Sequence, residues 1–538
     1  MDAKRLYEIG NQLFSKRSSL LNLWQEIAEN FYPERADFTT KRSLGDEFAA
    51  NLTTSYPVIA RRDLGNAFST MLRPGNKAWF NMSLRNDDSD LDHDAKTWLE
   101  RATKVQYRVM HNPGSLFTKA TAQGDHDFAA FGQCAISVEM NKLNNGLLYR
   151  CWHLRDLAWA EDEEGKIAYI FRRWKPRVHE LMTLFPGKLH RELVDKAVKD
   201  PFGEASVMHM VVKSELLSKK YPTEWVSIYY DCEHNVVIED VGMHYHMYII
   251  PRWQTVSGSQ YAYSPATVAA LPDARLLQAM TFTLLEAGEK HTNPPMIAVK
   301  EALRSDLSIY AGGVTWVDSS YDERLGEVLR PLTQDKSGMP LGLEMAQDTR
   351  AMITQAFYLN KLNLPQRSSD MTAYEVGQRI QQYIREALPL FEPMEVEYNG
   401  ALCDMTFDLI MRAGGFGPTI NLPRQLQGAD IQFNFESPLH DAIEKEKGNR
   451  FLEAQSFIIS AAQLDQSSMA IMDAPKALRD VLHGIKVPTE WTRSQDEVEQ
   501  IAKEQAQQVQ TAQAMNTVQQ GAEVAKTLSE TRTEGGLI

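Results

Sequence analysis

The chain has 538 residues, 43% of them hydrophobic and 24% charged, and a formal net charge of −14. This composition is typical of a globular protein with a large core, and the length predicts three or four domain-sized units. The acidic balance argues against tight, non-specific binding of nucleic acid, because neutralising phosphates requires Lys and Arg. It remains compatible with a protein that lets DNA pass without holding it.

Two further composition features narrow the class of protein. The four cysteines form no CxxC pair, which favours reduced thiols in an intracellular protein. No run reaches about 18 uninterrupted apolar residues, so we expect no membrane span.

The first quarter of the chain has helical periodicity. Apolar residues at i, i+3, i+4 and i+7 predict one amphipathic helix over residues 4–31, which Pro33 ends. A polar, aperiodic loop follows over residues 33–50. Three more helices are predicted, over residues 55–72, 92–111 and 115–130.

After Gly132 the apolar period changes to that of strands. Short helices near 178–185 and 189–198 interrupt the series, without the regular βαβ rhythm of a doubly wound sheet. The sequence therefore predicts an α+β domain over residues 132–255, on a helical N-terminal layer. The expected strands cover residues 135–140, 147–153, 166–173, 207–212, 225–230, 236–239 and 243–252.

A helix, a small insert and a second helix come next. The first helix is predicted over residues 266–290, with Pro272 near its first turn. The insert, residues 296–336, contains candidate strands over 296–299 and 313–317. After a linker at 337–343, whose last residues overlap the helix start, a second helix is predicted over 342–363.

The stretch from Leu364 to Gly415 combines a polar loop with an unusually long helical pattern. Thr372 and Glu375 form a capping box at the helix start, and Gly414 with Gly415 offers a C-cap. The pattern covers roughly 40 residues, or about 60 Å at 1.5 Å per residue. Prolines 389 and 393 predict a kink near its middle. The polar loop consists of Gln366, Arg367, Ser368, Ser369 and Asp370.

The last part of the chain is less informative. Residues 416–440 are predicted to be extended, and residues 440–485 to form helices. Residues 492–534 are rich in Gln, Ala and Glu with sparse apolar positions, which is expected either to be disordered or to pack against copies of itself.

The sequence contains no catalytic signature. GxxxxGK[ST], GxSxG and HExxH are all absent. His244 and His246 stand at i and i+2 and would share one face of a predicted strand, but no Cys or acidic cluster stands at ligand spacing, so we expect no metal site there. The acidic runs at 87–90 and 161–164 are interpreted as solvated turns, and Trp152 and Trp159 as core or interface aromatics. The residues alone thus indicate a large, non-enzymatic, assembling protein without a cofactor.

Two stretches and the order of elements resemble the head-to-tail connector (portal) family of short-tailed, double-stranded DNA bacteriophages. The first stretch is LWQEIAENFYPERADF, Leu23–Phe38. The second is AFYLNKLNL…MTAYEVGQR, Ala356–Leu364 and Met371–Arg379, which is similar to the family's F-x-L…MTATEV-x-x-R pattern. Tyr374 stands where the family often has Thr, which leaves the capping box intact. The similarity runs over nearly the whole chain, and its motifs are packing motifs.

The resemblance implies a mainly α, α+β portal fold that assembles as a ring, usually of twelve subunits. It assigns a wing to residues 1–265, with a helical layer at 1–131 and a strand-rich part at 132–255. Stem helices at 266–290 and 342–363 flank a clip at 291–341. The remaining parts are a tunnel loop at 364–371, a long kinked helix returning to the wing at 372–440, and a helical crown or barrel at 441–538.

The resemblance also implies a function in the virion, after assembly in the host cytoplasm. The ring would occupy one capsid vertex and form the channel through which the terminase large subunit packages double-stranded DNA. Tail adaptor or nozzle proteins and the major capsid and scaffolding proteins would be its other partners. In the tunnel loop, Arg367 is the only cation, and it is expected to meet either DNA or an acidic group of a neighbouring subunit. Lys336 and Arg350 are further candidates for the channel wall.

Two other classes of protein remain open: a different virion assembly protein and an enzyme such as a nuclease. Among assembly proteins, a scaffold would be more helical and would lack the strand-rich block, whereas a tail-tube or adaptor subunit would not need the helix–insert–helix unit. A nuclease would require clustered carboxylates, which the sequence does not place together.

Overall fold

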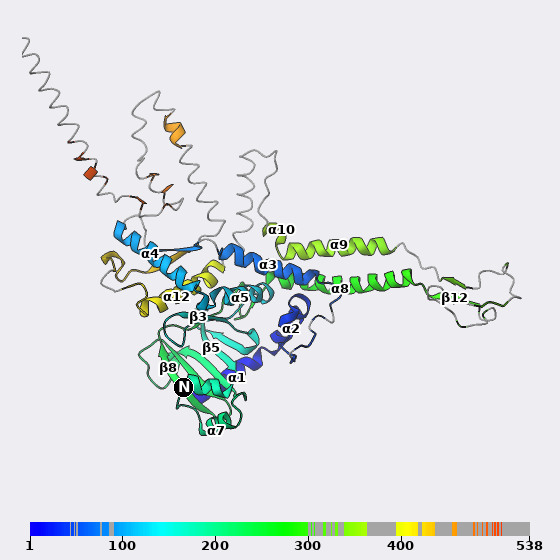
Figure 1. Ribbon diagram of the computed structural model, residues 1–538, viewed down its shortest axis with the longest axis horizontal. Coiled ribbons are helices and arrows are strands. Elements are labelled where there is room, and N and C mark those ends of the chain that lie inside the picture. Colours follow the sequence, from blue (N-terminus) through cyan, green and yellow to red (C-terminus); the bar gives the residue numbers. More distant parts are fainter. Residues whose placement is uncertain are drawn as a thin grey trace, which may run out of the picture. The chain divides into compact units, whose positions relative to one another are not determined.

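The computed structural model describes most of residues 1–299 and several later segments. The described residues are 1–43, 45–47, 49, 52–75, 78–84, 91–299, 303, 306, 316–318, 324, 329–331, 338–362, 394–417, 422–435 and scattered positions between 454 and 507. They form a mixed α+β structure in which helices predominate (Figure 1). Two compact units are distinguished: one comprises 1–79 and 106–413, the other 80–105 and 414–538.

The N-terminal segment forms two helices where the sequence predicts one. Helices α1 (Ala3–Lys16) and α2 (Ser18–Phe31) are separated at Arg17. The buried Arg17 guanidinium donates to the carbonyls of Leu154 and Arg155, and burial lowers the pKa of Arg17 to about 10. The apolar period continues across the break, so the single-helix prediction over residues 4–31 was wrong because a distant contact interrupts the helix.

The other helices of the N-terminal layer agree with their predicted ranges. Gly132 ends α5 in the left-handed region, with φ of 72°, where glycine carries no Cβ penalty. The helices are α3 (Tyr56–Leu72), α4 (His93–Met110) and α5 (Phe117–Phe131).

A five-stranded antiparallel sheet forms the strand-rich part of the first unit, in the order β4-β5-β6-β7-β8. Alternate residues of β6 face opposite sides: Met208 and Met210 pack beneath α1, whereas Val207 contacts α6 and α7. Helices therefore pack on both faces of this sheet, although the edge strand β8 exposes Val236, Val237 and Val241. Its elements are β4 (Leu157–Glu161), β5 (Ile167–Trp174), α6 (Val178–Leu184), α7 (Arg191–Lys199), β6 (Val207–Lys213), β7 (Trp225–Asp231) and β8 (Val236–Met243).

A smaller sheet in the order β3-β2-β9 lies in the same unit. The predicted strand over 243–252 was mostly wrong: β8 continues to Met243, and only β9 (Tyr248–Ile249) is a strand in the remainder. The prediction stopped β8 early because its apolar alternation breaks at Glu239 and Asp240. The other short strands are β2 (Ile136–Met140), β3 (Leu147–Cys151), β10 (Gln254–Thr255) and β11 (Ala262–Tyr263).

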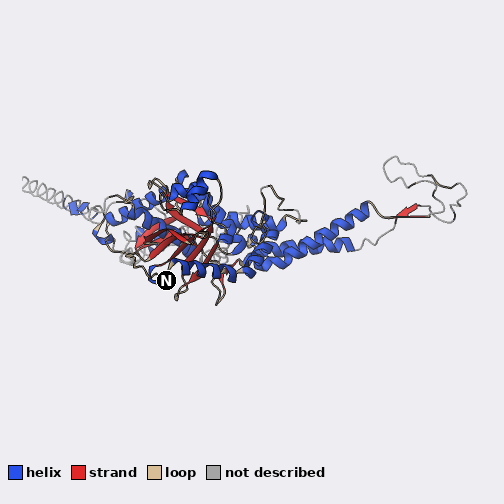
Figure 2. Cartoon of the chain, turned by 90° about the horizontal axis from the view of Figure 1, so that it is seen from below, coloured by secondary structure: helices blue, strands red, loops and turns tan. Residues whose placement is uncertain are grey.

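Two long helices, α8 (Pro265–Thr292) and α9 (Gly338–Ala356), lie side by side in both views (Figure 1 and Figure 2). Pro272 lies inside α8 rather than in its first turn, because Ser264 caps the helix by accepting from the Thr267 backbone N–H. Likewise, α9 begins at Gly338, so much of the predicted linker at 337–343 is helical. Strands β12 (Met296–Ala298) and β13 (Leu329–Pro331) pair between the two helices in the chain, and α10 (Leu359–Leu362) follows α9.

The C-terminal end of the predicted long helix is described, and its N-terminal part, residues 363–393, lies outside the described residues. A π-helical turn over Glu395–Gly400 leads into α12 (Ala401–Arg412). The helix then ends as predicted, because Gly414 follows its cap residue with φ of 70°. The predicted kink at Pro389 and Pro393 falls within the undescribed segment.

In the second unit, β1 (Phe80–Leu84) pairs antiparallel with β14 (Ile431–Phe435). The Phe80 and Phe433 rings meet edge to face across this pair at 5.8 Å. β14 falls within the segment predicted to be extended, whereas β1 was not predicted. Its partner is about 350 residues away, so no local pattern announces it.

Candidate functional site

Most of the sequence-predicted site residues lie outside the described residues: Lys336, Gln366, Arg367, Ser368, Ser369, Asp370, Thr372 and Glu375. Arg350 is described. It is exposed on α9, with its guanidinium carbon 5.9 Å from the centre of the Tyr56 ring. The tunnel loop, its capping box and the expected place of Arg350 on the channel wall therefore stay predictions.

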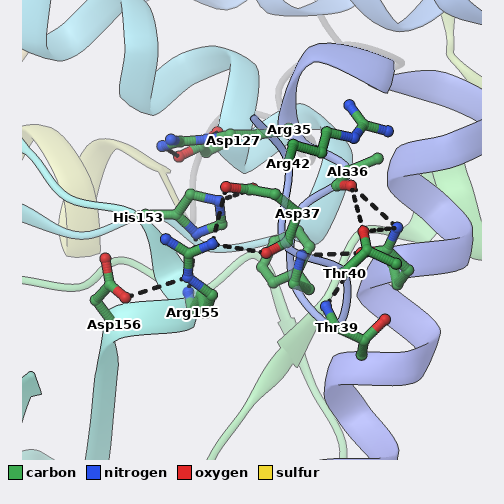
Figure 3. Close-up of polar contacts among 12 residues, drawn as sticks. Arg35, Ala36, Asp37, Thr39, Thr40, Arg42, Asp127, His153, Arg155 and Asp156 are labelled. Atoms are coloured by element: carbon green, nitrogen blue, oxygen red, sulfur yellow. Dashed lines mark hydrogen bonds and ion pairs between the residues drawn. The ribbon is translucent and has the colours of Figure 1, made fainter. Parts of the chain in front are cut away.

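The stretch Leu23–Phe38, by contrast, is well described and organises a polar network (Figure 3). Arg35 binds the Asp127 carboxylate of α5 with two nitrogens, at 3.1 Å from Nε and 2.7 Å from Nη2. The Asp127 side chain is 1% exposed, so the carboxylate of this pair is shielded from solvent. Burial alone would lower the pKa of Arg35, but the Asp127 charge outweighs it and raises that pKa.

Asp37 joins the same loop to the segment between β3 and β4. Its carboxylate contacts His153 Nε2 at 2.5 Å and accepts from Arg155 Nη1 at 2.9 Å. Burial would raise the pKa of Asp37, but His153 and Arg155 together lower it. The Asp37 backbone carbonyl also accepts from Arg155, at 2.7 Å.

Gln25 of α2 holds the loop from inside. Its Oε1 accepts from the backbone N–H groups of Phe38 and Thr39, and its Nε2 donates to the Ala36 carbonyl at 3.0 Å. A single side chain thus binds three backbone groups of the loop, two of which belong to the buried residues Ala36 and Phe38 and need a partner inside the protein. Trp24, the preceding residue, packs on the Phe38 ring at 5.5 Å.

This network, residues 25, 35, 37, 127, 153 and 155, connects three parts of the chain but has no plausible nucleophile–base arrangement. Its charges are satisfied by one another at hydrogen-bond distance, and the adjoining Phe38 ring packs against Phe131. The geometry therefore makes it a structural junction. The sequence revealed the motif through its resemblance, but not its partners Asp127 and Arg155, which are about 90 and 120 positions away.

Polar contacts anchor the two long helices, α8 and α9, to other parts of the first unit. The Gln278 side chain of α8 accepts from the backbone N–H groups of Thr53 and Thr54 and donates to the Thr54 carbonyl. Nearer the helix start, the Thr267 hydroxyl donates to the Ala130 carbonyl at 2.8 Å. On α9, the Thr354 hydroxyl meets the Tyr56 hydroxyl at 2.6 Å.

Apart from these polar anchors, α8 and α9 expose large apolar side chains along their lengths. Each is between 45% and 60% exposed, which is unusual for so many long apolar residues on one helix pair. The sequence signal was the broad spread of apolar residues around α8, wider than one buried face requires. The exposed residues are Val268, Leu276, Phe282 and Leu285 on α8, and Leu341, Leu343, Met345 and Met352 on α9.

Among the remaining residues singled out from the sequence, His246 and Asp162 make contacts that hold the fold together. His244 and His246 lie beyond the end of β8 rather than on a strand, and His246 Nδ1 meets the Tyr248 carbonyl at 2.7 Å. Asp162 caps the turn at 161–164 and pairs with Lys213 at 2.8 Å. The other acidic run, at 87–90, lies outside the described residues.

The two tryptophans singled out from the sequence are both packed. Trp159 is fully buried in β4, as expected for a core aromatic. Trp152 follows β3, donates to Ser137 Oγ at 2.8 Å and stacks under the Arg172 guanidinium at 3.9 Å. Among the described helices, none has both the length and the apolar character needed to cross a membrane.

Comparison with known proteins supplies the relationship. The family model described as "Bacteriophage head to tail connecting protein" matches residues 3–492. The probable portal protein of Bordetella phage BPP-1 is 23% identical over 549 positions, and the portal protein of Salmonella phage epsilon15 is 22% identical over 552. Each alignment covers 99% of this chain and 96% of the relative.

Among solved structures, a chain described as "Virion of native gene transfer agent (GTA) particle" gives a TM-score of 0.30 at 9% identity. It covers 75% of this chain and 86% of that one. A score this low does not establish a common fold. The family model, however, spans most of the sequence, and so this chain belongs to the bacteriophage head-to-tail connecting, or portal, protein family, whose members are virion components.

Proposed function

We propose that copies of this chain assemble into a ring at one capsid vertex, with α8 and α9 forming an interface between neighbours. The observation that carries this proposal is the exposed apolar surface of the helix pair, which a single chain leaves in water. Burying such side chains is worth about 25 cal/mol per Å² removed from solvent. Family membership supports a ring, for which about twelve subunits is the number expected.

The centre of the ring would form the channel through which genomic DNA enters during packaging and leaves during ejection. Twelve copies at −14 would carry about −168 in total, against one phosphate charge per about 1.7 Å of duplex. Exposed charges interact mainly within about 8 Å at physiological salt. A largely acidic wall would therefore repel DNA at close range, and a few cations such as Arg367 would steady it transiently.

The subunit plan follows the family layout. Residues 1–265 and 372–440 would form the wing, residues 266–290 and 342–363 the stem, residues 291–341 the clip, residues 364–371 the tunnel loop and residues 441–538 the crown or barrel. The clip would dock the terminase large subunit, which supplies ATP hydrolysis, and later the tail adaptor or nozzle. Scaffolding and major capsid proteins would meet the outside of the ring during assembly in the host cytoplasm. The chain itself would act as a passive conduit without enzymatic activity.

The ring and its interface are tested by electron microscopy of the purified protein with one charge placed on α8. We expect rings of about twelve subunits for the wild type and their loss in Leu285→Asp, because a carboxylate cannot be buried unpaired at an apolar interface. Leu143→Asp is the matched control: Leu143 is even more exposed, at 79%, but lies in the β2–β3 turn. Filaments or monomers of the wild type would refute the ring, whereas rings of Leu285→Asp would refute only this interface.

The channel role of Arg367 requires a separate test. Arg367→Ala should leave rings intact while altering DNA packaging or retention in infected cells. Arg5→Ala, at an exposed arginine of α1, controls for loss of one charge per subunit. Failure of Arg367→Ala to form rings would instead indicate that Arg367 binds an acidic group of the neighbouring subunit.

A further inference from the structure

The start of α7 and the turn between β7 and β8 bring two histidines and a glutamate together. His190 precedes α7, Glu192 is in its first turn, and His234 lies in the turn. One potential ligand atom from each of the three lies within 4.8 Å of the other two. Two imidazoles and one carboxylate form a donor set that suits Zn²⁺ with an open fourth position.

His234 is already oriented for such a role. Its Nδ1 lies 2.6 Å from Oδ2 of Asp231, whose side chain is 2% exposed. The other Asp231 oxygen accepts from the backbone N–H groups of Glu233 and His234, at 2.9 Å and 3.3 Å, which fixes the carboxylate. A carboxylate on Nδ1 leaves Nε2 as the metal-binding nitrogen, an arrangement found repeatedly behind histidine ligands.

One of the ligand distances is already near the value that a shared ion requires, and the three ligand atoms lie within 4.8 Å of one another. Ligands held at about 2.0–2.1 Å in a tetrahedron lie about 3.3 Å from one another. His234 Nε2 is 3.1 Å from Glu192 Oε2. His190 stacks on His234 with ring centroids 4.4 Å apart, and its Nδ1 accepts only a long hydrogen bond of 3.4 Å from the Glu192 N–H. Binding would require the His190 ring to move closer to Glu192 and His234, at the expense of this long capping bond.

We propose that His190, Glu192 and His234 bind a divalent transition-metal ion of the Zn²⁺ type, with Asp231 positioning His234. The ion would join the start of α7 to the edge of the five-stranded sheet, where Leu193 of that helix already packs near Ile238 of β8. This site is independent of the proposed ring and of any DNA contact.

Isothermal titration calorimetry of the metal-free, full-length protein with Zn²⁺ tests the site. We expect one ion per chain, and a loss of affinity of 100-fold or more in Glu192→Gln and in His234→Ala. Glu192 is exposed, with 73% of its side chain in solvent, so its substitution leaves the fold intact. His244→Ala, at an exposed histidine outside the cluster, should bind as the wild type does.

Asp231→Asn separates a positioning role from a merely structural one. Asparagine keeps an oxygen for the two backbone N–H groups, but its NH₂ group donates to Nδ1 and so places the proton on Nε2. We expect about 10–100-fold weaker Zn²⁺ binding with an unchanged melting temperature of the metal-free protein. Less than one ion per wild-type chain, or equal affinity in Glu192→Gln, would overturn the proposal and leave His234 as a proton-sharing partner of the two carboxylates.

Discussion

Replacing Arg35 by Met is the sharpest test of the network around the Leu23–Phe38 stretch. The substitution keeps the length of the side chain but leaves the Asp127 carboxylate buried without its partner. Removing one member of a buried ion pair typically costs 3–5 kcal/mol. Because the Arg35 side chain is 25% exposed, we place the cost at the lower end, about 3 kcal/mol.

Hydrogen exchange of a peptide covering residues 32–42, followed by mass spectrometry, measures this cost locally. It avoids treating a chain of 538 residues as a two-state folder. Where exchange reports the opening equilibrium, about 3 kcal/mol corresponds to exchange roughly 100-fold faster. The Phe38 and Thr39 amides should respond most clearly, since both donate to Gln25 inside the network.

Arg42→Met is the matched control from the same loop. Arg42 donates to the Pro33 carbonyl at 2.6 Å, so its loss removes a hydrogen bond without stranding a charge. A cost of about 1 kcal/mol, or roughly 5-fold faster exchange, is expected. The double variant Arg35→Met/Asp127→Leu should recover part of the loss, because neither charge is then left unpaired. Equal effects of Arg35→Met and Arg42→Met would show that leaving the Asp127 carboxylate without Arg35 carries no extra cost.

Three further predictions concern other parts of the first unit. His209 is fully buried, and this burial, together with the nearby Arg172 charge, lowers its pKa well below 6.5. The unfolded chain therefore binds a proton at His209 below about pH 6.5 that the folded chain does not. As the pH falls through this range, the free energy of unfolding should decrease by up to about 1.4 kcal/mol per pH unit. Denaturant midpoints at pH 7.5 and 5.5 should differ less in His209→Gln than in the wild type. Gly132→Ala should lower the melting temperature and soluble yield far more than Gly165→Ala: both have positive φ, but only at Gly132 would a Cβ overlap neighbouring backbone. Gln278→Ala should speed hydrogen exchange at residues 52–55 by about 10-fold, because it removes the acceptor of two backbone amides, and no change would contradict the proposed anchor.

The local structure was largely predictable from the sequence. The helices α3, α4, α5 and α8 and most strands of the large sheet match their predicted ranges, since their apolar periods reflect one dominant buried face. The glycine end of α12 was equally visible, because positive φ is a local requirement.

Two of the errors, at Arg17 and at β1, arise from partners that are distant in the sequence. Arg17 breaks the first helix through carbonyls almost 140 positions away, and β1 pairs with a strand near residue 433. Neither partner leaves a trace in the neighbouring sequence. The same holds for the polar networks: Arg35 was visible within a motif, but Asp127 was not, and the grouping of His190 with His234 depends on a turn 44 positions away. The predicted DNA-facing residues, including Arg367, remain to be tested by the packaging experiment.

The anchorage of the long helices has a mechanical consequence. Contacts at Thr267, Gln278 and Thr354 clamp one end of the α8–α9 pair, while the helices continue well past the last clamp on α8. The pair thus resembles a beam fixed at one end, in which a sideways force at the tip produces its greatest bending moment at the support. Pro272 lies between the anchoring residues Thr267 and Gln278 of α8. The helix hydrogen bond that proline removes is therefore missing in a part of α8 that neighbouring residues support. A sideways force applied near β12 would therefore load the hydrogen bonds of Gln278 with Thr53 and Thr54 most heavily.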